Sequence, residues 1–385
     1  PMPRTHGSSR PRTRRSVVAA LVTALFASGV AIAATGATTA GAAPRLFGSG
    51  STFLPGVNAG NSPQLASGPD GTSLAVFVDR DDFQYVASTR RITFSIGDAP
   101  LPLAKASGVL GPLYDIAITD DLTQVAASAT GTAQNTLNKL VIWRRTAGAA
   151  SWAAPVEIAF PATASPAVNV QILSDGSVLM VWQDSADQIK AARVAPGAST
   201  FGTTENVSAV NDGSGLKLWA GRNGQAAVAW FKKGTNTIVT SLRPTPTSTF
   251  GAAQTIPRNL TDDTNLSNYE IAIGDDGRMA FASQARNGPG GNKIKVWLRP
   301  KDGVWDSGQI VSTGTGNSFD FPKIGIDGTG RTVVAWQNTL TNLSNSGHVV
   351  QVTERGPGGT DLWQPPATLS EPSTYQEIPS LAVAS

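Results

Sequence analysis

LSDGSVLMVWQD, residues Leu173 to Asp184, is the stretch that decides the fold, because the chain repeats its pattern. GRNGQAAVAWFK (Gly221 to Lys232) and DGTGRTVVAWQN (Asp327 to Asn338) share with it a turn glycine, an apolar run and a tryptophan six residues after the glycine. A pattern that returns at a fixed distance indicates a fold built from similar stacked units.

Weaker copies extend this repeat over most of the chain. They are GPDGTSLAVFVD (Gly68 to Asp79), GDDGRMAFASQA (Gly274 to Ala285) and TDDLTQVAASAT (Thr119 to Thr130), which has lost the glycine. The distances between successive anchors are 51, 54, 48, 53 and 53 residues, and the anchors are Gly71, Leu122, Gly176, Gly224, Gly277 and Gly330. The repeating unit is therefore roughly fifty residues long.

Each unit predicts four β-strands, a to d. Strand a is short, as in YEIAI (Tyr269 to Ile273), and a tight Asp-Gly or Asn-Gly turn leads to strand b, as in TVVAW (Thr332 to Trp336). The continuous apolar run of strand b indicates that both of its faces are covered. Strand c alternates, as in KIKVWLR (Lys293 to Arg299), and strand d is expected to begin at a recurring aromatic residue such as Trp305.

Four-stranded units of this length, stacked face to face, predict an all-β fold, a β-propeller of four-stranded antiparallel blades. A string of small sandwich domains is the competing architecture, but roughly fifty residues are too few for a sandwich and no linkers separate the units. The six predicted complete blades span about residues 62–109, 110–161, 162–211, 212–263, 264–316 and 317–372.

The two ends of the repeat region carry incomplete units. QEIPSLAVAS (Gln376 to Ser385) aligns with strand a, and STFLPGVNAGN (Ser51 to Asn61) aligns with strand d. Propellers commonly close their ring with one blade built from both termini. We therefore expect a seven-bladed design in a C-terminally truncated sequence, with a split blade from residues 45–61 and 376–385. A six-bladed ring with two spare strands is the alternative.

The first 42 residues are typical of a secretory signal peptide. They have an arginine-rich start, an apolar stretch and a cleavage site of small residues, with cleavage expected after Ala42. The expected location is therefore extracellular, by general secretion or, given Arg14 and Arg15, by twin-arginine export. A retained membrane anchor is the alternative. We expect residues 43–385 to form the propeller, with no transmembrane span after the signal is removed.

Charge and composition exclude several classes of function. The signal segment contains five arginines and no acidic residue, so its removal leaves 25 basic against 27 acidic side chains and a formal charge of −2. That balance argues against a nucleic-acid partner. The chain has no cysteine, and His348 is the one histidine outside the signal. Thiolate catalysis, cysteine zinc sites and multi-histidine metal sites are therefore excluded.

The units resemble the repeats of secreted bacterial β-propeller proteins, with Asp-Gly, an apolar run, Trp, an alternating strand, Arg, Pro-Gly and an aromatic residue. SDGSVLMVWQDSADQIKAARVAPGASTF (Ser174 to Phe201) carries this pattern, and the resemblance covers about residues 53–385. It implies the fold and leaves the function open, because propellers include enzymes, lectins and scaffolds.

Two further resemblances are more distant. Sialidase-like propellers place the Asp-box tryptophan soon after its glycine and between strands c and d, whereas here it follows by six residues and lies between a and b. Propeller lectins resemble this chain in repeating Trp and Arg at matching blade positions, but the different spacing prevents any transfer of their binding residues.

The recurrent side chains have a structural explanation. The tryptophans of strand b (Trp182, Trp230 and Trp336) are expected to wedge between blades rather than stack on a sugar, since every blade must solve the same packing problem. An arginine after each strand c is expected to close the blade edge by pairing with carbonyls or acids; these are Arg90, Arg144, Arg193, Arg243, Arg299 and Arg355.

The b–c and d–a loops vary between units, whereas the a–b turns and c–d loops on the opposite face are more uniform. Variable loops on one face commonly form a binding surface, and these are rich in polar residues that suit a glycan, although simple solvation is an equal explanation. The residues predicted to bind a ligand there are Asp79, Asp81, Asp184, Lys232, Asp263, Arg286, Asp320 and Asn338. We predict no catalytic residue.

No cofactor or metal ligand is predicted. Carboxylates occur in DRDD (Asp79 to Asp82), TDD (Thr261 to Asp263) and GDDG (Gly274 to Gly277), but none has the spacing of a calcium loop, so Ca²⁺ receives no support. Aspartates in such turns commonly bond to the local backbone.

The function that the sequence favours is a secreted, monomeric, non-enzymatic propeller that binds a polar ligand, either a glycan or a cell-surface protein, through the b–c and d–a loops. One alternative is a propeller-type glycoside hydrolase, sialidase-like enzyme or lyase, which needs two carboxylates facing one cavity, about 5–9.5 Å apart. The other is a structural or docking module of a larger surface protein.

Overall fold

The computed structural model describes residues 19–24, 30–35, 64–67, 72–79, 84–91, 101–103, 106, 109–131, 137–161, 168–235, 237–257, 266–286, 292–313, 318–340, 347–358, 361–370 and 380–383. Within these ranges all regular secondary structure is β-strand, so the predicted all-β class is confirmed. In these ranges no helix is long and apolar enough to cross a membrane.

Six four-stranded antiparallel sheets follow one another along the chain, and consecutive strands are neighbours in each. Sheet 1 consists of β3 (Gln64–Ser67), β4 (Thr72–Asp79), β5 (Gln84–Arg91) and β6 (Leu101–Pro102). Sheet 2 consists of β7 (Val109–Ile118), β8 (Gln124–Gly131), β9 (Leu137–Arg145) and β10 (Val156–Ala159). Sheet 3 consists of β11 (Val168–Ile172), β12 (Val178–Gln183), β13 (Ile189–Val194) and β14 (Glu205–Asn206).

The second half of the chain repeats this arrangement. Sheet 4 consists of β15 (Gly213–Ala220), β16 (Ala226–Lys232), β17 (Thr237–Arg243) and β18 (Gln254–Thr255). Sheet 5 consists of β19 (Leu266–Ile273), β20 (Met279–Arg286), β21 (Asn292–Arg299) and β22 (Gln309–Ile310). Sheet 6 consists of β23 (Ser318–Ile326), β24 (Thr332–Leu340), β25 (Gly347–Arg355) and β26 (Ala367–Thr368).

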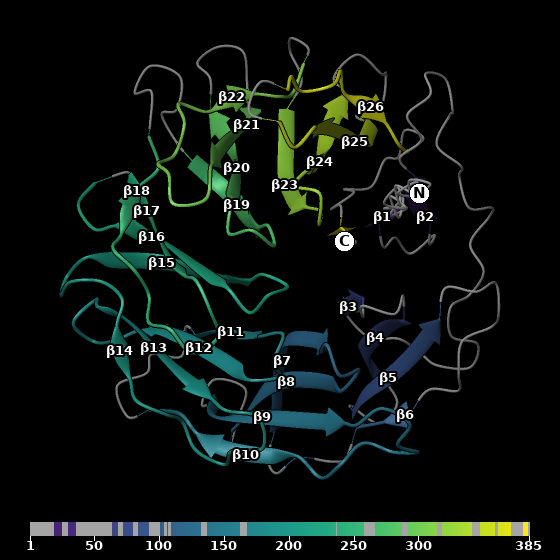
Figure 1. Ribbon diagram of the computed structural model, residues 1–385, viewed down its shortest axis with the longest axis vertical. Coiled ribbons are helices and arrows are strands. Elements are labelled where there is room, and N and C mark those ends of the chain that lie inside the picture. Colours follow the sequence, from purple (N-terminus) through teal and green to yellow (C-terminus); the bar gives the residue numbers. More distant parts are fainter. Residues whose placement is uncertain are drawn as a thin grey trace, which may run out of the picture.

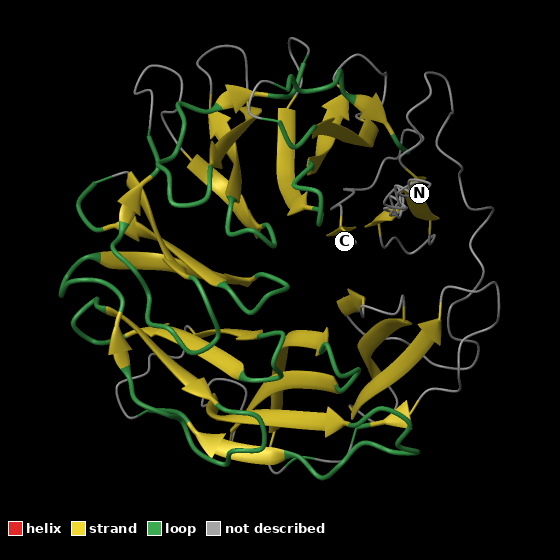
Figure 2. Ribbon diagram, viewed as in Figure 1, coloured by secondary structure: helices red, strands yellow, loops and turns green. Residues whose placement is uncertain are grey.

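The sheets are arranged around one axis, with the first strand of each nearest the centre and the last at the periphery (Figures 1 and 2). We call β3, β7, β11, β15, β19 and β23 the inner strands. This is the architecture of a β-propeller, in which each sheet is a blade.

The a–b turns depend on one residue in the left-handed region. Gly176 has φ +76° and Gly330 has φ +88°, values that glycine adopts without steric cost. Leu122, which replaces the glycine in sheet 2, keeps the same turn at φ 62°. The turn hydrogen bond from Leu122 N to Thr119 O, 2.9 Å, matches that from Gly176 N to Leu173 O, 2.8 Å. The fold therefore imposes the turn even where the favoured residue is missing.

The core lies between adjacent sheets. Side chains alternate along β12, so Val178, Met180 and Trp182 face a cluster shared with sheet 2, while Leu179 and Val181 face a cluster shared with sheet 4. Trp182, Trp230 and Trp336 are fully buried, with an exposed fraction of 0%. This burial agrees with the expectation that the tryptophans wedge between blades.

Strand d differs from its prediction. It was expected to begin at the aromatic residue, but β22 begins four residues after Trp305, at Gln309. Trp305 is buried, and its Nε1 donates to Thr240 Oγ1 of sheet 4 over 3.0 Å. Trp305 thus anchors the c–d connection to the preceding sheet, whereas in sheet 6 the equivalent Trp363 forms an isolated antiparallel bridge with Arg355 of strand c.

A three-stranded sheet contains β1 (Ala19–Ala24), β2 (Val30–Thr35) and β27 (Ser380–Val383), in the order β2–β1–β27. β27 contacts the inner strands β23 and β3, so it takes the strand a position predicted for the C-terminal segment. Its partner is β1, from the segment expected to be a signal peptide, with Ala20 opposite Val383. The predicted partner at 45–61 lies outside the described residues, and the seven-bladed design therefore stays a prediction.

Candidate functional site

Two of the residues predicted to bind a ligand on the loop face have local partners. Asp184 is 8% exposed, accepts hydrogen bonds from the backbone of Ala186 and Gln188, and pairs with Lys190 at 2.9 Å. Burial opposes ionisation of Asp184, but these contacts outweigh it and hold its pKa below the usual range. Lys232 lies 3.7 Å from Asp212. Both side chains therefore already have partners within the protein.

The remaining loop-face candidates are spread over several sheets. Asp320 accepts hydrogen bonds from Gln284 Nε2 and, at 3.0 Å, from Ser318 Oγ. Asn338 is buried, with an exposed fraction of 2%. Asp79 and Arg286 are the last residues of β4 and β20, and Asp81 and Asp263 lie outside the described residues.

A row of polar side chains instead occupies one position of the inner strands. Each member of the row is opposite an equivalent residue of strand b, as Lys217 is opposite Ala229 and Glu270 is opposite Ala282. The row consists of Asp115, Asn169, Lys217, Glu270 and Lys323. The residue after each is buried and apolar: Ile116, Val170, Leu218, Ile271 and Ile324.

A β-bulge precedes the polar residue in four of these strands. The register shifts lie between Ser214 and Lys217 in β15, Ser267 and Glu270 in β19, and Asp320 and Lys323 in β23, and β7 has two such shifts before Asp115. The extra residue in β19 is accommodated with Asn268 at φ 46°. Bulges re-aim the following side chain and are common beside functional sites.

Three neighbouring inner strands are joined by this row. Trp219 Nε1 donates to Glu270 Oε2 at 2.6 Å, and Lys323 Nζ pairs with Glu270 Oε1 at 2.6 Å. Lys217 Nζ donates to the carbonyl of Tyr269 at 2.7 Å and lies 4.6 Å from the centre of its ring. Burial lowers the pKa of Lys217, and the charge of Glu270 partly opposes this. The cluster forms a polar link between sheets 4, 5 and 6.

A cavity of about 210 Å³ opens on the inner strands, at the end where the a–b turns lie. Its lining comes from sheets 1 to 4 and presents both polar and apolar surface. The polar or charged residues of the lining are Asp115, Asp120, Gln171, Ser174 and Arg222.

Asp115 is the acidic residue held most firmly within the cavity. Its Oδ2 accepts a hydrogen bond from the backbone nitrogen of Ile172 in the next inner strand, 2.6 Å away. Burial raises the pKa of Asp115 to about 7, although the hydrogen bonds from Ile172 and Ile116 favour the charged form. Gln171 makes the equivalent contact one sheet further on, where its Oε1 accepts from Ala220 N at 3.2 Å.

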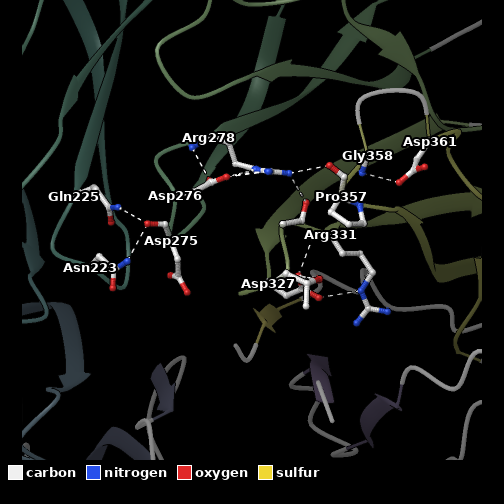
Figure 3. A network of polar contacts seen from close by, with 12 residues as sticks. Asn223, Gln225, Asp275, Asp276, Arg278, Asp327, Arg331, Pro357, Gly358 and Asp361 are labelled. Atoms are coloured by element: carbon white, nitrogen blue, oxygen red, sulfur yellow. Dashed lines mark hydrogen bonds and ion pairs between the residues drawn. The ribbon is translucent and has the colours of Figure 1, made fainter. Parts of the chain in front are cut away.

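Arg222 supplies the positive charge of the cavity. Its Nη1 is buried and has no hydrogen-bond partner in the part of the chain that the structure describes. The turn that carries Arg222 is fixed by its neighbours, because Asn223 Nδ2 and Gln225 Nε2 both donate to the carbonyl of Asp275, at 2.9 and 3.1 Å (Figure 3). The guanidinium therefore projects from a turn that is anchored to the next sheet.

The same face is reinforced further around the ring. Arg278 donates from Nη1 to the carbonyls of Gly330 and Pro357, at 3.2 and 3.1 Å, and pairs with Asp276 at 2.8 Å (Figure 3). The recurrent arginines of strand c also have structural partners: Arg193 bonds to Asp175 at 2.6 Å, and Arg243 pairs with Glu205. This agrees with the expectation that they close blade edges.

Among the described residues no group of three or more His, Asp or Glu side chains could hold a metal ion. The polar groups that line the cavity are Asp115, Asp120, Gln171, Ser174 and Arg222.

The polar row on the inner strands and the cavity were not predicted from the sequence, because strand a served only to count blades. A signal was present: Asp115, Lys217, Glu270 and Lys323 each put a charge into a strand that is otherwise mostly apolar, directly before a buried aliphatic residue. A charge repeated at one strand position cannot be explained by turn chemistry. Arg222 could not be distinguished from an ordinary turn residue.

No protein-family model matches the chain, and no curated protein sequence matches it. Solved structures do resemble it. A putative 6-phosphogluconolactonase from Bacteroides fragilis matches with a TM-score of 0.52 and 14% identity, covering 97% of this chain and 100% of that one. The β-propeller domain of the trilobed protease from Pyrococcus furiosus matches with a TM-score of 0.51 and 10% identity, covering 94% and 97%.

A polysaccharide lyase that acts as an ulvan lyase matches with a TM-score of 0.51 and 10% identity, covering 83% of this chain and 86% of that one. At these identities the matches show the fold alone: the chain is a β-propeller similar to those of lactonases, proteases and lyases.

Proposed function

We propose that this chain is a secreted, non-enzymatic β-propeller that binds a polar ligand of carbohydrate type in the cavity among its inner strands. The observation that carries the proposal is the lining of that cavity, where side chains from different sheets bring a carboxyl group, an amide, a hydroxyl and a guanidinium together. Ligand sites in proteins are commonly built in this way, from a largely pre-formed pocket and a few convergent polar groups.

The site is therefore moved from the loop face, where the sequence analysis put it, to the centre of the ring. Asp184 and Lys232 of the loop face already form ion pairs, whereas the polar groups of the cavity come from different sheets to line one hollow.

A cavity-filling substitution tests the proposal. Ala117 lines the cavity, and Ala117→Leu places three further carbon atoms in its space. We expect the full chain to bind members of a glycan array, and we expect Ala117→Leu to abolish that binding while the chain stays folded. Ala66→Leu fills the same cavity from sheet 1, and Lys232→Met is the control on the loop face. Binding that survives both fillings and is lost in the control would place the site on the loops.

An enzyme is the second candidate, and one observation favours it. A half-buried carboxyl group with its pKa raised to about 7, such as Asp115, is suited to general acid catalysis near neutral pH. Glycoside hydrolysis needs a second carboxylate across the substrate, and Asp120 is the other acidic residue that lines the cavity. Release of reducing ends from a panel of polysaccharides distinguishes the two: an enzyme loses turnover in Asp115→Asn, and a binding protein has none to lose.

Closure of the ring as a seven-bladed design is also part of the proposal. Support comes from the contacts of β27 with β23 and β3, the inner strands on its two sides. A chain that begins at residue 43 tests how the ring closes. An unchanged midpoint of thermal unfolding is expected if residues 45–61 complete the blade, and a lower midpoint would assign closure to β1 and β2.

A further inference from the structure

The size of the cavity limits what it can hold. Its volume of about 210 Å³ lies below the range of roughly 300–1,000 Å³ that drug-sized ligands occupy. It suits a molecule of the size of one hexose, or one terminal unit of a longer chain. Partly exposed apolar lining residues, such as Ala117 and Ile118, suit the carbon face of such a unit.

Arg222 determines the charge of the ligand. Arg222 is the one positively charged side chain in the described lining of the cavity. A planar carboxylate matches the fork of the guanidinium and accepts two parallel hydrogen bonds from it. The turn of Arg222 is held by the bonds of Asn223 and Gln225 to the carbonyl of Asp275, so the fork is positioned before a ligand arrives.

The other polar groups of the cavity suit the hydroxyl groups of the same ligand. Ser174 and Gln171 are neutral and can donate or accept hydrogen bonds. One carboxylate oxygen of Asp115 already accepts a hydrogen bond from the backbone nitrogen of Ile172. Asp120 is exposed and lies in the turn of sheet 2. The lining therefore combines one cation, Arg222, with two neutral polar groups and two carboxyl groups, of which Asp115 is half-buried and Asp120 is exposed.

We propose that the cavity binds a sugar acid, a hexose-sized polyol that carries a carboxylate, and that Arg222 binds this carboxylate. The inference rests on the proposed function and specifies its ligand class. A free uronic acid and a uronic acid at the end of a glycan present the same chemistry, so both are included.

Matched ligands test the proposal on the full chain. Glucuronic, galacturonic and mannuronic acids are each compared by calorimetric titration with the neutral parent hexose, which differs in having an alcohol in place of the carboxylate. We expect at least one uronic acid to bind about tenfold or more tightly than its parent. A uronic-acid-terminated disaccharide distinguishes the sources: binding as tight as that of the free acid indicates a glycan end, and failure to bind indicates the free acid.

Variants of Arg222 assign the role. Arg222→Gln is expected to remove the preference for the acid, and Arg222→Lys is expected to keep part of it, because the charge remains but the fork is lost. Arg278→Gln is the matched control, since Arg278 lies on the same face and its contacts are structural. Its preference for the acid should equal that of the unmodified chain.

The outcomes separate the two proposals. If neutral hexoses bind as tightly as their acids, or if Arg222→Gln keeps the full preference, the cavity binds a polar ligand but the assignment of a sugar acid to Arg222 is wrong. If neither acids nor hexoses bind the full chain, the proposed function fails and this inference fails with it.

Discussion

Asp115 on β7 accepts a hydrogen bond from the backbone nitrogen of Ile172 on β11 at 2.6 Å, which joins two neighbouring inner strands at the cavity. This carboxyl group is enclosed by the fold, and burial raises its pKa to about 7. The same carboxyl group, that of Asp115, therefore connects two blades and lines the candidate site.

The first prediction concerns stability against pH. The folded-state pKa of Asp115, about 7, lies above its ordinary value of 3.8, so between these values the folded chain holds a proton that the unfolded chain has released. The contribution of Asp115 to the free energy of unfolding is therefore largest below pH 4 and declines as pH rises to 7. Asp115→Asn keeps an acceptor for Ile172 N and should flatten this decline in urea unfolding measured from pH 4 to 8. An unchanged slope would contradict the prediction.

Ligand binding should show a related dependence. Above pH 7 ionised Asp115 adds a negative charge beside the proposed carboxylate, in a lining whose other charged residues are Asp120 and Arg222. The affinity for a uronic acid should fall between pH 6 and 8, and the affinity for a neutral hexose should change less. Titrations of Asp115→Asn over the same range should show no fall; a fall of equal size in this variant would assign the effect elsewhere.

Core tryptophans should contribute mainly to stability. Trp182 is fully buried between sheets, so Trp182→Ala should lower the free energy of unfolding by about 3–5 kcal/mol. Trp219 is partly exposed beside Glu270, and Trp219→Ala should cost clearly less. Urea denaturation of both variants measures the difference. Equal losses would show that the two tryptophans have the same packing role.

The link between sheets 5 and 6 should be modest in strength. Glu270 and Lys323 are 2.6 Å apart, but their side chains are 23% and 34% exposed, so solvent screens the pair. A double-mutant cycle with Glu270→Gln and Lys323→Met should give a coupling of about 1 kcal/mol or less, reduced at high salt. A larger coupling that salt does not affect would indicate that the pair is effectively buried.

Leu122 offers a substitution that should stabilise the chain. It occupies the left-handed region at φ 62°, where a side chain costs about 1–2 kcal/mol, so Leu122→Gly should raise the free energy of unfolding by about 1 kcal/mol. Gly176→Ala is the reciprocal test, because its new Cβ would lie 3.2 Å from Arg144 Nη1 and 3.3 Å from Thr119 Cγ2. Thermal melting should move upward for the first variant and downward for the second. A lower midpoint for Leu122→Gly would mean that contacts of the leucine side chain outweigh the strain.

Much of this fold could be predicted from the sequence, because the information is local and repeated. A turn glycine, a buried run and a tryptophan recur with each unit, and the structure contains the predicted four-stranded sheets with Trp182, Trp230 and Trp336 fully buried. The predicted start of strand d was wrong. In sheet 5 the strand begins at Gln309, because Trp305 packs against sheet 4.

The candidate site could not be predicted in the same way. Its residues come from different sheets, as Asp115, Gln171 and Arg222 do, and only the closing of the ring brings them to one cavity. Asp184 was predicted to bind a ligand because its carboxylate lies in a variable loop. In the structure this carboxylate accepts hydrogen bonds from the backbone nitrogens of Ala186 and Gln188. Sequence spacing alone does not distinguish a carboxylate that caps its own turn from one that faces a cavity.

The most direct test of the central claim is the structure of the full chain with a bound uronic acid. We expect the sugar in the cavity of the inner strands, with its carboxylate within hydrogen-bond distance of the Arg222 guanidinium and its hydroxyl groups near Gln171 and Ser174. A sugar bound instead at the b–c and d–a loops, beside residues such as Asp184 or Lys232, with the cavity unoccupied, would contradict it.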